Sequence, residues 1–416
     1  MSFFETAVDR FLGGVVKRGV LEIVHADGRV ARFGTPEPGF PEVRMRLADA
    51  NVARGIVLDP GLGAAEAFMD GRLVLEQGDI LALLELVRTN SPWDRGANLG
   101  TPSLFRRLRG IVSARVDGYN QARSAKANVA HHYDLGNDFY RLFLDRRMQY
   151  SCAYWPRPDM SLDQAQDAKL VHIAAKLRLS PGLHVLDIGC GWGGLAIYLA
   201  QNCGVRVTGI TLSEEQLVLA RSEAQAAGVA DCVTFELVDY RDLAARGTRF
   251  DRIASVGMFE HVGSPQFPAF FRACATMLAD DGVMMLHTIG RMNEPGATDA
   301  FTRKYIFPGG YIPALSETVA ASEPFRLIAS DVEMLRLHYA FTLRAWYANC
   351  ARHQAQIEAM YDARFFRMWQ FYLAGAATAF ENSGLCNYQI VFLRDRHATP
   401  ITRDWIAAAE SALSGA

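Results

Sequence analysis

The sequence lacks the features that mark several large protein classes. Its seven cysteines form no CxxC pair and no Cys/His ligand spacing, so we expect reduced, buried thiols and no metal site. No apolar run approaches the roughly 18 residues that a membrane-spanning helix needs. Residues 1–10 have early acids and no basic stretch, so we expect no signal peptide and a cytoplasmic protein. A formal net charge of −2 gives no field that would select nucleic acid.

The composition that remains is ordinary for a globular protein, with 50% hydrophobic and 21% charged residues. The length of 416 residues leaves room for two domains. Residues 1–100 are expected to form a small N-terminal α+β domain. Its spacing predicts helices over 3–16, 61–71 and 78–87, a strand over 51–59, and a hairpin, 20–24 with 29–33, that turns at Asp27-Gly28. Nothing in this region carries chemistry, which favours an accessory or dimerisation domain.

A basic linker helix is predicted over 101–130. Its cations outnumber the single acid, Asp117, and alternate with apolar residues: they are Arg106, Arg107, Arg109, Arg115, Arg123 and Lys126. Such a helix can lie on an anionic membrane surface. A solvated linker helix that packs its apolar stripe on the next domain is the alternative.

The most informative stretch, VLDIGCGWGGLAIYLA at 185–200, predicts a buried strand, a glycine-rich turn and a helix. This combination is typical of a nucleotide site at the carboxyl edge of a parallel sheet. Asp187 ends the strand beside the turn, which suits a cationic ligand. Thr211, after the second strand, stands where a dinucleotide-binding protein has its ribose-binding acid. The pattern favours S-adenosylmethionine (AdoMet) over NAD or a turn without a ligand.

Residues 131–416 are expected to form one catalytic domain, because strands and helices alternate after the glycine turn. Strands are predicted over 205–210, 233–238, 251–256 and 282–288, and helices over 214–227 and 266–279. That alternation indicates a parallel, helix-covered α/β sheet. A long helical stretch to about 383 and a closing strand over 387–394, expected at the antiparallel edge, complete the domain.

Polar residues follow several of these strands. Asp239 follows the third strand and suits an adenine amine, or it caps the next turn. Glu260 and His261 follow the fourth strand, and His287 lies at the end of the fifth. An acid and a histidine on neighbouring strand ends can bind a metal, perform acid–base chemistry or cap loops. The apolar loop over 291–325 would suit an acyl chain, or it covers a small satellite core.

In these segments the chain resembles the cyclopropane-fatty-acyl-phospholipid synthase family, relatives of the mycolic acid cyclopropane synthases. The resemblance runs along essentially the whole chain. It is carried by HHYDLGN (131–137), QYSCAYW (149–155), LDIGCGWGG (186–194), GITLSEEQ (209–216), MFEHVG (258–263), KYIFPGG (304–310) and the segment 338–347. The resemblance implies a Rossmann-like class I AdoMet-dependent methyltransferase fold. It also implies methylene transfer from AdoMet to the cis double bond of an unsaturated phospholipid acyl chain, which forms a cyclopropane.

The resemblance also implies a set of site residues. Bicarbonate, held as the base, would be bound by Cys152, Glu260, His287, Ile289 (through its backbone) and Tyr339. AdoMet would be bound by Tyr150, Ser151, Asp187, Gly189, Gly191, Gly193, Thr211, Gln216, Asp239 and Tyr240. A carboxylate beside an anion is unfavourable, so we expect either Glu260 or the anion to carry a proton when the site is loaded. Tyr154, Trp155, Tyr305 and Phe307 would stabilise a passing cation through their ring faces.

The implied partners are membrane phospholipid and a second copy of the chain, as a homodimer in peripheral contact with the inner membrane. A related lipid C-methyltransferase, which leaves a methyl-branched or methylated unsaturated chain, has the same site. A non-enzymatic lipid-binding protein on a decayed methyltransferase fold is the third hypothesis, and it predicts no AdoMet binding.

Overall fold

The structure is a computed structural model that describes residues 2–96 and 135–414. The chain divides into two compact units: the first combines 1–107, 298–308 and 343–384, and the second combines 108–297, 309–342 and 385–416. The first unit thus takes up segments that we assigned to the catalytic domain. The predicted linker helix over 101–130 and the HHYD part of the motif at 131–137 lie outside the described residues.

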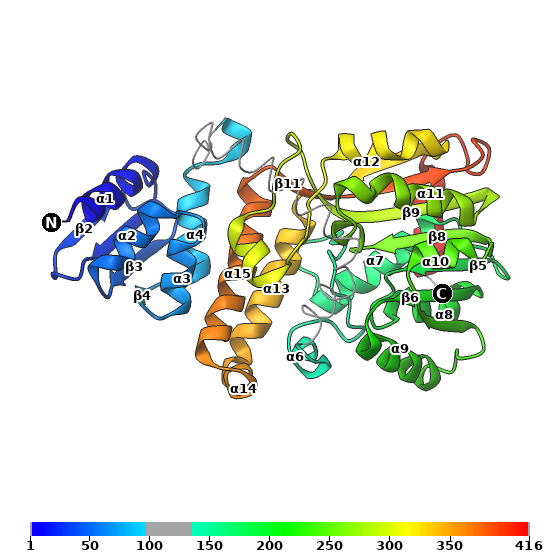
Figure 1. The fold of residues 1–416 in the computed structure, drawn as a ribbon, viewed down its shortest axis with the longest axis horizontal. Helices are drawn as coiled ribbons and strands as arrows, with labels where there is room; N and C mark the ends of the chain where they lie inside the picture. Colours follow the sequence, from blue (N-terminus) through cyan, green and yellow to red (C-terminus); the bar gives the residue numbers. More distant parts are fainter. Residues whose placement is uncertain (1, 97–134, 415–416) are drawn as a thin grey trace. The chain divides into compact units, whose positions relative to one another are not determined.

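The first unit contains a four-stranded sheet in the order β2-β1-β3-β4, seen in blue in Figure 1. Its strands are β1 (Val20–Val24), β2 (Val30–Phe33), β3 (Glu42–Leu47) and β4 (Leu73–Gln77). Strands β1 and β2 pair antiparallel around Gly28, which has a φ of +86°, so the predicted hairpin is confirmed. Strand β1 is parallel to β3, and β3 is antiparallel to β4. Strands β3 and β4 were not predicted.

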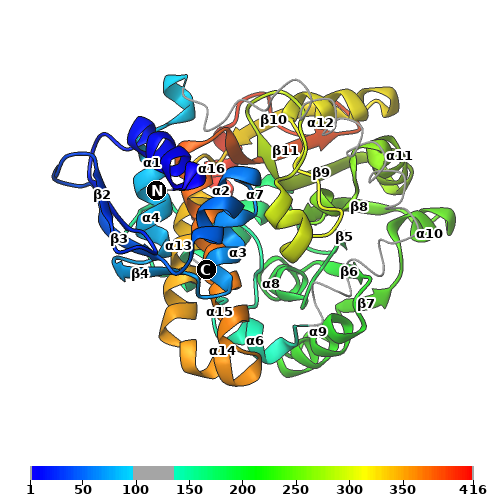
Figure 2. The same cartoon turned by 60° about the vertical axis from the view of Figure 1, so that its left-hand side comes forward.

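The first unit also contains several helices. They are α1 (Phe3–Val15), α2 (Ala50–Leu58), α3 (Gly63–Met69), α4 (Ile80–Thr89), α14 (Gln354–Met360) and α15 (Ala363–Asn382), with short turns η1 (Trp93–Arg95) and η4 (Thr302–Ile306). Helix α15 packs on α3 and α4, as two views show (Figures 1 and 2). The long helix α13 (His338–Arg352) crosses from the second unit into the first.

The strand predicted over 51–59 is wrong, because these residues form α2. The side chain of Asp49 caps this helix by accepting a hydrogen bond from the Asn51 N–H at 2.9 Å. Val52 and Ala53 are buried on one side of it. Packing of that side overrides the strand preference of the valines and isoleucine.

The second unit is built on a seven-stranded sheet in the order β10-β11-β9-β8-β5-β6-β7. Its strands are β5 (His184–Ile188), β6 (Arg206–Thr211), β7 (Val233–Leu237), β8 (Phe250–Val256), β9 (Leu278–Arg291), β10 (Ile328–Met334) and β11 (Leu385–Leu393). Strands β5 to β9 are parallel, so the predicted Rossmann-like fold is confirmed. Strand β11 is antiparallel, as predicted, but it lies between β9 and β10, so β10 is the edge strand.

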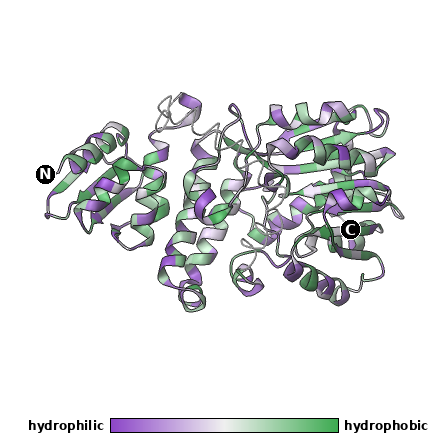
Figure 3. Ribbon diagram, in the orientation of Figure 1, coloured by the Kyte–Doolittle hydropathy of each residue, from purple (hydrophilic) through white to green (hydrophobic). Residues whose placement is uncertain are grey.

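Helices cover both faces of this sheet. They are α6 (Asn137–Arg141), α7 (Leu162–Lys176), α8 (Gly194–Cys203), α9 (Glu214–Ala226), α10 (Tyr240–Ala245), α11 (Phe267–Met277), α12 (Leu315–Ser322) and α16 (Asp404–Ser414), with turns η2 (Phe259–His261), η3 (Ser264–Gln266) and η5 (Glu323–Phe325). Helix α12 carries both hydrophilic and hydrophobic residues (Figure 3), as a helix with one face on a core should.

The alternation of side chains along the strands decides which face each site residue occupies. Leu186 and Ile188 pack with α10 and α11 in one core cluster. Val185 and Met285 pack with α7 and α8 in another. Asp187 and His287, each two residues further along its strand, therefore lie on the α7 side of the sheet.

The apolar segment over 291–325 is partly folded, since it contains α12 and η4. Phe301 and Ile306 are buried within the first unit, whereas Tyr311 and Leu315 pack against the core of the second. These contacts favour the satellite-core alternative for these four residues. In the described ranges 2–96 and 135–414, no helix is sufficiently long and apolar to cross a bilayer.

Candidate active site

Two positions in the turn after β5 leave no room for a side chain. Gly189 has a φ of +81°, and a Cβ there would lie 2.8 Å from the Met258 side chain. Gly193 has a φ of +84°, and a Cβ there would lie 2.6 Å from Phe235. Gly191, between them, also has a positive φ of +55°. The turn holds the backbone at the carboxyl edge of β5 and β6, where the Gly189 N–H donates to the Ile210 carbonyl.

Asp187 lies at the start of this turn, and its side chain is buried, with 2% exposure. One carboxylate oxygen, Oδ2, has no hydrogen-bond partner in the described part of the chain. Burial raises the pKa of Asp187 to about 7, although the charge of Lys169 opposes this rise. A buried carboxyl with an unused oxygen suits a cationic ligand such as AdoMet, so the residues present fit that cofactor.

The predicted ribose side of the site is preassembled. The Thr211 hydroxyl donates to Gln216 Oε1 at 2.8 Å, and it accepts from the Ser213 N–H at 3.2 Å. Both Thr211 and Gln216 are buried at the carboxyl end of β6 and the start of α9. The geometry brings these two predicted residues together next to the glycine turn, because Gly189 bonds to the same strand.

The predicted adenine residues have structural partners of their own. Asp239 caps α10 by accepting from the Arg241 N–H at 2.9 Å, and its carboxylate also binds the Arg241 side chain at 2.6 and 2.8 Å. Tyr240 packs edge-on against Phe270 in the core of the second unit. The capping alternative for Asp239 therefore describes its structural role, and its contact with adenine stays a prediction.

Glu260 lies in η2, directly after β8, with 8% exposure. The backbone N–H of Ile289 donates to its Oε1 at 2.6 Å, so the predicted backbone group of Ile289 already holds this carboxyl. The other oxygen, Oε2, has no partner in the described part of the chain. Burial raises the pKa of Glu260 to about 7, so this carboxyl carries a proton during part of its time at neutral pH.

His287 lies on the adjacent strand β9, with 1% exposure. The amide nitrogen of Gln389, its cross-strand neighbour on β11, lies 3.1 Å from Nδ1. Burial lowers the pKa of His287 well below 6.5, so the ring is neutral. With Nδ1 accepting from Gln389, the ring proton is on Nε2, which has no partner among the described residues.

The segment 149–155 is fixed on two sides. Gln166 of α7 donates to the carbonyls of Gln149 and Ser151 at 3.2 and 3.0 Å. The Ala153 N–H donates to Thr342 Oγ1 at 3.1 Å, on the α13 side. Cys152 is buried between these anchors, and burial raises the pKa of its thiol far above 9, so the thiol stays protonated.

The remaining predicted residues divide between the units. Tyr339 is buried at the start of α13, next to His338, whose Nδ1 accepts from the Trp155 N–H at 2.8 Å. Tyr150 packs against Tyr140 in the second unit. The ring of Tyr154 is stacked on His172, with centroids 4.1 Å apart. Tyr305 and Phe307 belong to the first unit, so their predicted role toward a cation stays a prediction.

Sequence reasoning missed three buried polar residues at this site, which are Lys169, Asn387 and Gln389. Asn387 and Gln389 lie opposite Ile289 and His287 in the β9–β11 ladder, and each has a side-chain oxygen without a partner in the described part. The sequence could have indicated them, because they are polar residues at positions i and i+2 of an otherwise apolar strand. Lys169 is likewise a charged residue among the buried positions of α7.

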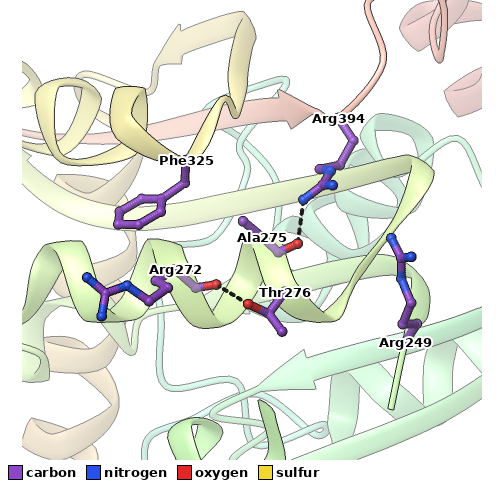
Figure 4. Close-up of a pocket in the computed structure, with 6 residues that line it drawn as sticks. All are labelled: Arg249, Arg272, Ala275, Thr276, Phe325 and Arg394. Atoms are coloured by element: carbon purple, nitrogen blue, oxygen red, sulfur yellow. Dashed lines mark hydrogen bonds between the residues drawn. The ribbon is translucent and has the colours of Figure 1, made fainter. Parts of the chain in front are cut away.

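A hollow of about 270 Å³ lies at the opposite, amino edge of the same sheet. Figure 4 shows three arginines in its lining, namely Arg249, Arg272 and Arg394. Arg394 donates to the Ala275 carbonyl at 2.6 Å, and Arg249 donates to the Leu278 carbonyl at 2.8 Å and to Asp280 at 2.6 Å. None of the predicted site residues lines this hollow.

Comparison with known proteins agrees with this geometry. The family model for mycolic acid cyclopropane synthetase matches residues 120–390. The cyclopropane-fatty-acyl-phospholipid synthase of Escherichia coli (strain K12) is 37% identical over 369 residues, which are 89% of this chain and 92% of that protein. A probable fatty acid methyltransferase of Pseudomonas putida is 42% identical over 286 residues, 66% of this chain and 72% of that protein.

Among solved structures, mycolic acid cyclopropane synthase CmaA1, complexed with SAH and CTAB, superposes with a TM-score of 0.61 at 33% identity. The match covers 64% of this chain and 98% of that one. The glycine turn and the preassembled polar site at the carboxyl edge of the sheet are therefore those of an AdoMet-dependent methyltransferase. The chain belongs to the cyclopropane-fatty-acyl-phospholipid synthase family, which includes the mycolic acid cyclopropane synthases.

Proposed function

We propose that this enzyme transfers a methylene group from AdoMet to the cis double bond of an unsaturated phospholipid acyl chain, with a bound bicarbonate as the base. The identity to the E. coli synthase over 89% of the chain supports the substrate class. One structural observation carries the proposal of the base. Two buried atoms on neighbouring strands, Glu260 Oε2 and His287 Nε2, have no partner among the described residues.

The chemistry of these two atoms suits a small planar anion. His287 offers a donor from a neutral ring, and Glu260, whose pKa is raised to about 7 by burial, offers a second donor when protonated. Two donors at the ends of neighbouring strands could bind two oxygens of one anion. Protonation of Glu260 also removes the like-charge repulsion that an ionised carboxylate would exert. The protonated thiol of Cys152 and the phenol of Tyr339 would complete the set.

The chain's own residues then have distinct roles in the reaction. AdoMet, held at the glycine turn, would supply an electrophilic methyl group to the alkene of the lipid, and its sulfur would keep the electron pair of the broken S–CH₃ bond. Asp187 holds a carboxylate near the cofactor turn, where it stabilises positive charge. A cationic carbon forms on the lipid, and a proton must leave the new methyl group before the ring closes. The lone pair of His287 lies on Nδ1, where Gln389 occupies it, and the Cys152 thiol is protonated, so neither side chain offers the cation a strong nucleophile.

A lipid assay tests the product. We expect lipids from a host without its own synthase to gain one CH₂ per modified chain when this enzyme is expressed, and to resist mild hydrogenation at that position. The matched control is the Glu260→Gln variant, which should leave the lipids unchanged. The 42% identity to a probable fatty acid methyltransferase favours a second candidate, transfer without ring closure. That enzyme would give a methyl-branched chain, or a methylated unsaturated chain that hydrogenation reduces.

We further propose that the enzyme acts as a homodimer in peripheral contact with the inner membrane. The basic segment that contains Arg106, Arg107 and Arg109 supplies the charge for this contact. Changing these three residues to Gln should weaken binding to anionic vesicles at low salt. The control changes Arg32, Arg44 and Arg46, which pair with Glu22 or Glu76, and should leave binding unchanged. Equal vesicle binding by both variants would favour a packed linker. Sedimentation velocity tests the dimer.

A further inference from the structure

Helix α7 contains two lysines, Lys169 and Lys176, whose side chains are fully buried, with 0% exposure. The Lys176 ammonium pairs with Glu333 at 2.5 Å and lies 3.7 Å from Asp331. Lys169 is different: within 2–96 and 135–414 it forms no ion pair within 4.0 Å, and its one hydrogen bond is to the Ser151 hydroxyl at 2.8 Å. Burying an ammonium without a close carboxylate destabilises the folded protein, so we ask what Lys169 does at this position.

The surroundings of Lys169 are the predicted site itself. Its charge acts on Asp145, Cys152 and Asp187, and on His287 across the same face of the sheet. Burial raises the pKa of the Cys152 thiol, and Lys169 opposes that rise. Burial lowers the pKa of His287, and Lys169 adds to that effect. The field of one ammonium therefore reaches two of the predicted anion ligands on separate elements.

The carboxyls around Lys169 leave its charge free to act toward an anion. Without ligands, Asp145 and Asp187 are the carboxyls on which the Lys169 charge acts most directly. Asp145 already accepts from the N–H groups of Arg147 and Gln149 at 2.8 Å each. When the cationic cofactor occupies the glycine turn, Asp187 has a counter-charge of its own. Asp145 still acts on Lys169 from beyond 4.0 Å, and the ammonium is the buried positive charge that also acts on Cys152 and His287.

We propose that Lys169 is a positioning residue of the anion site: its buried ammonium orients Ser151 and supplies the positive charge that lets bicarbonate bind beside Glu260. This inference rests on the proposed function, because it assumes that bicarbonate is the base. Lys169 need not touch the reacting atoms. It acts by making a pocket with a carboxyl and a neutral imidazole favourable for an anion.

The test titrates bicarbonate into enzyme from which it has been removed, for the wild type and for Lys169→Met, which keeps the length of the side chain without its charge. We expect the half-saturating bicarbonate concentration to rise roughly tenfold in the variant, the effect of losing one charge in a protein interior. AdoMet affinity, measured by calorimetry, should stay equal or become tighter, because a cation near a cationic cofactor has gone. An unchanged half-saturation with weaker AdoMet binding would confine Lys169 to holding Ser151 and overturn the inference.

A second measurement does not depend on folding of the variant. Burial lowers the pKa of Lys169 to about 8, so wild-type half-saturation by bicarbonate should rise as the pH passes about 8. Glu260 and Asp187 have pKa values raised to about 7, and the pKa of Cys152 lies far above 9. Loss of the Glu260 proton alone raises half-saturation by at most about tenfold per pH unit, so the Lys169 step is a steeper rise above pH 8. A profile that rises no more steeply above pH 8 than between pH 7 and 8 would overturn the inference. A wild-type enzyme that needs no bicarbonate would instead overturn the proposed base.

Discussion

The two edges of the seven-stranded sheet differ in whether their polar groups are buried and in how those groups are satisfied: Arg249 and Asp280 at the amino edge are exposed. At the amino edge, Arg249 and Arg394 donate to backbone carbonyls, and Asp280 pairs with Arg249. At the carboxyl edge, Asp187, Glu260 and His287 each keep a buried atom without a partner in the described part of the chain. A hollow whose polar groups bind one another is structural, whereas buried groups left unsatisfied mark a place for a ligand. The larger arginine content does not make the amino edge the functional one.

The largest contrast should come from neutralising one carboxyl at each edge. Glu260→Gln should lower turnover by roughly 100-fold to 10,000-fold, the range for loss of a base such as the bicarbonate that Glu260 helps to bind, while AdoMet binding stays close to that of the wild type. Asp280→Asn, at the amino edge, should keep turnover within about twofold, because surface ion pairs contribute little. Steady-state kinetics and calorimetry check both. Unchanged turnover in Glu260→Gln would exclude its role as an anion ligand.

The same carboxyls should differ in how they link stability to pH. Burial raises the pKa of Glu260 from 4.5 to about 7 in the folded protein, so the folded state keeps this proton to a higher pH than the unfolded state does. Its contribution to the free energy of unfolding therefore falls as pH rises from about 4.5 to about 7, by about 3 kcal/mol in total. Glu260→Gln cannot ionise, so it should gain that amount relative to the wild type across this range.

Denaturant unfolding at several pH values measures this difference. Asp280 is the control, because its hydrogen bond to Arg249 lowers the pKa below 3.8, and its effect is complete below this pH window. Asp280→Asn should therefore run parallel to the wild type between pH 4.5 and 7. A Glu260→Gln curve that also runs parallel would mean that the carboxyl is solvated in the folded protein.

Two glycines, one at each edge of the sheet, allow the cofactor turn to be tested against a turn without a predicted ligand. Gly189 at the carboxyl edge and Gly182 at the amino edge have φ values of +81° and +89°, but only at Gly189 would a Cβ clash, 2.8 Å from Met258. Both alanine variants should lose about 1 kcal/mol of stability from backbone strain. Only Gly189→Ala should weaken AdoMet binding, by roughly tenfold, because the turn must shift. Equal affinities in calorimetry would remove Gly189 from the cofactor site.

The smallest effect is expected in the arginine-lined hollow. Arg394→Gln removes the bond to the Ala275 carbonyl and should cost roughly 1 kcal/mol of stability. Turnover, bicarbonate dependence and AdoMet affinity should stay as in the wild type. A loss of activity without a loss of stability would show that this edge takes part in function after all.

Several elements followed from local sequence, because their signals span only a few residues. The Asp27-Gly28 turn predicted its hairpin, and the strand–glycine–helix pattern around Gly189 predicted the cofactor turn. The alternation after it predicted the parallel sheet. The strand expected over 51–59 failed because the Asp49 cap and one buried side of α2 outweighed side-chain propensity.

The chain by itself determined the glycine turn, the succession of parallel strands along the sequence, and the chemical types of the site residues. Only the tertiary structure decided that β11 enters between β9 and β10, which places Gln389 on His287 and gives the ring its tautomer. It also decided that Glu260 and Lys169 are buried without a close counter-charge in the described residues. The physical reason is that turns depend on neighbouring φ and ψ angles, whereas desolvation and pairing depend on groups that only packing brings together.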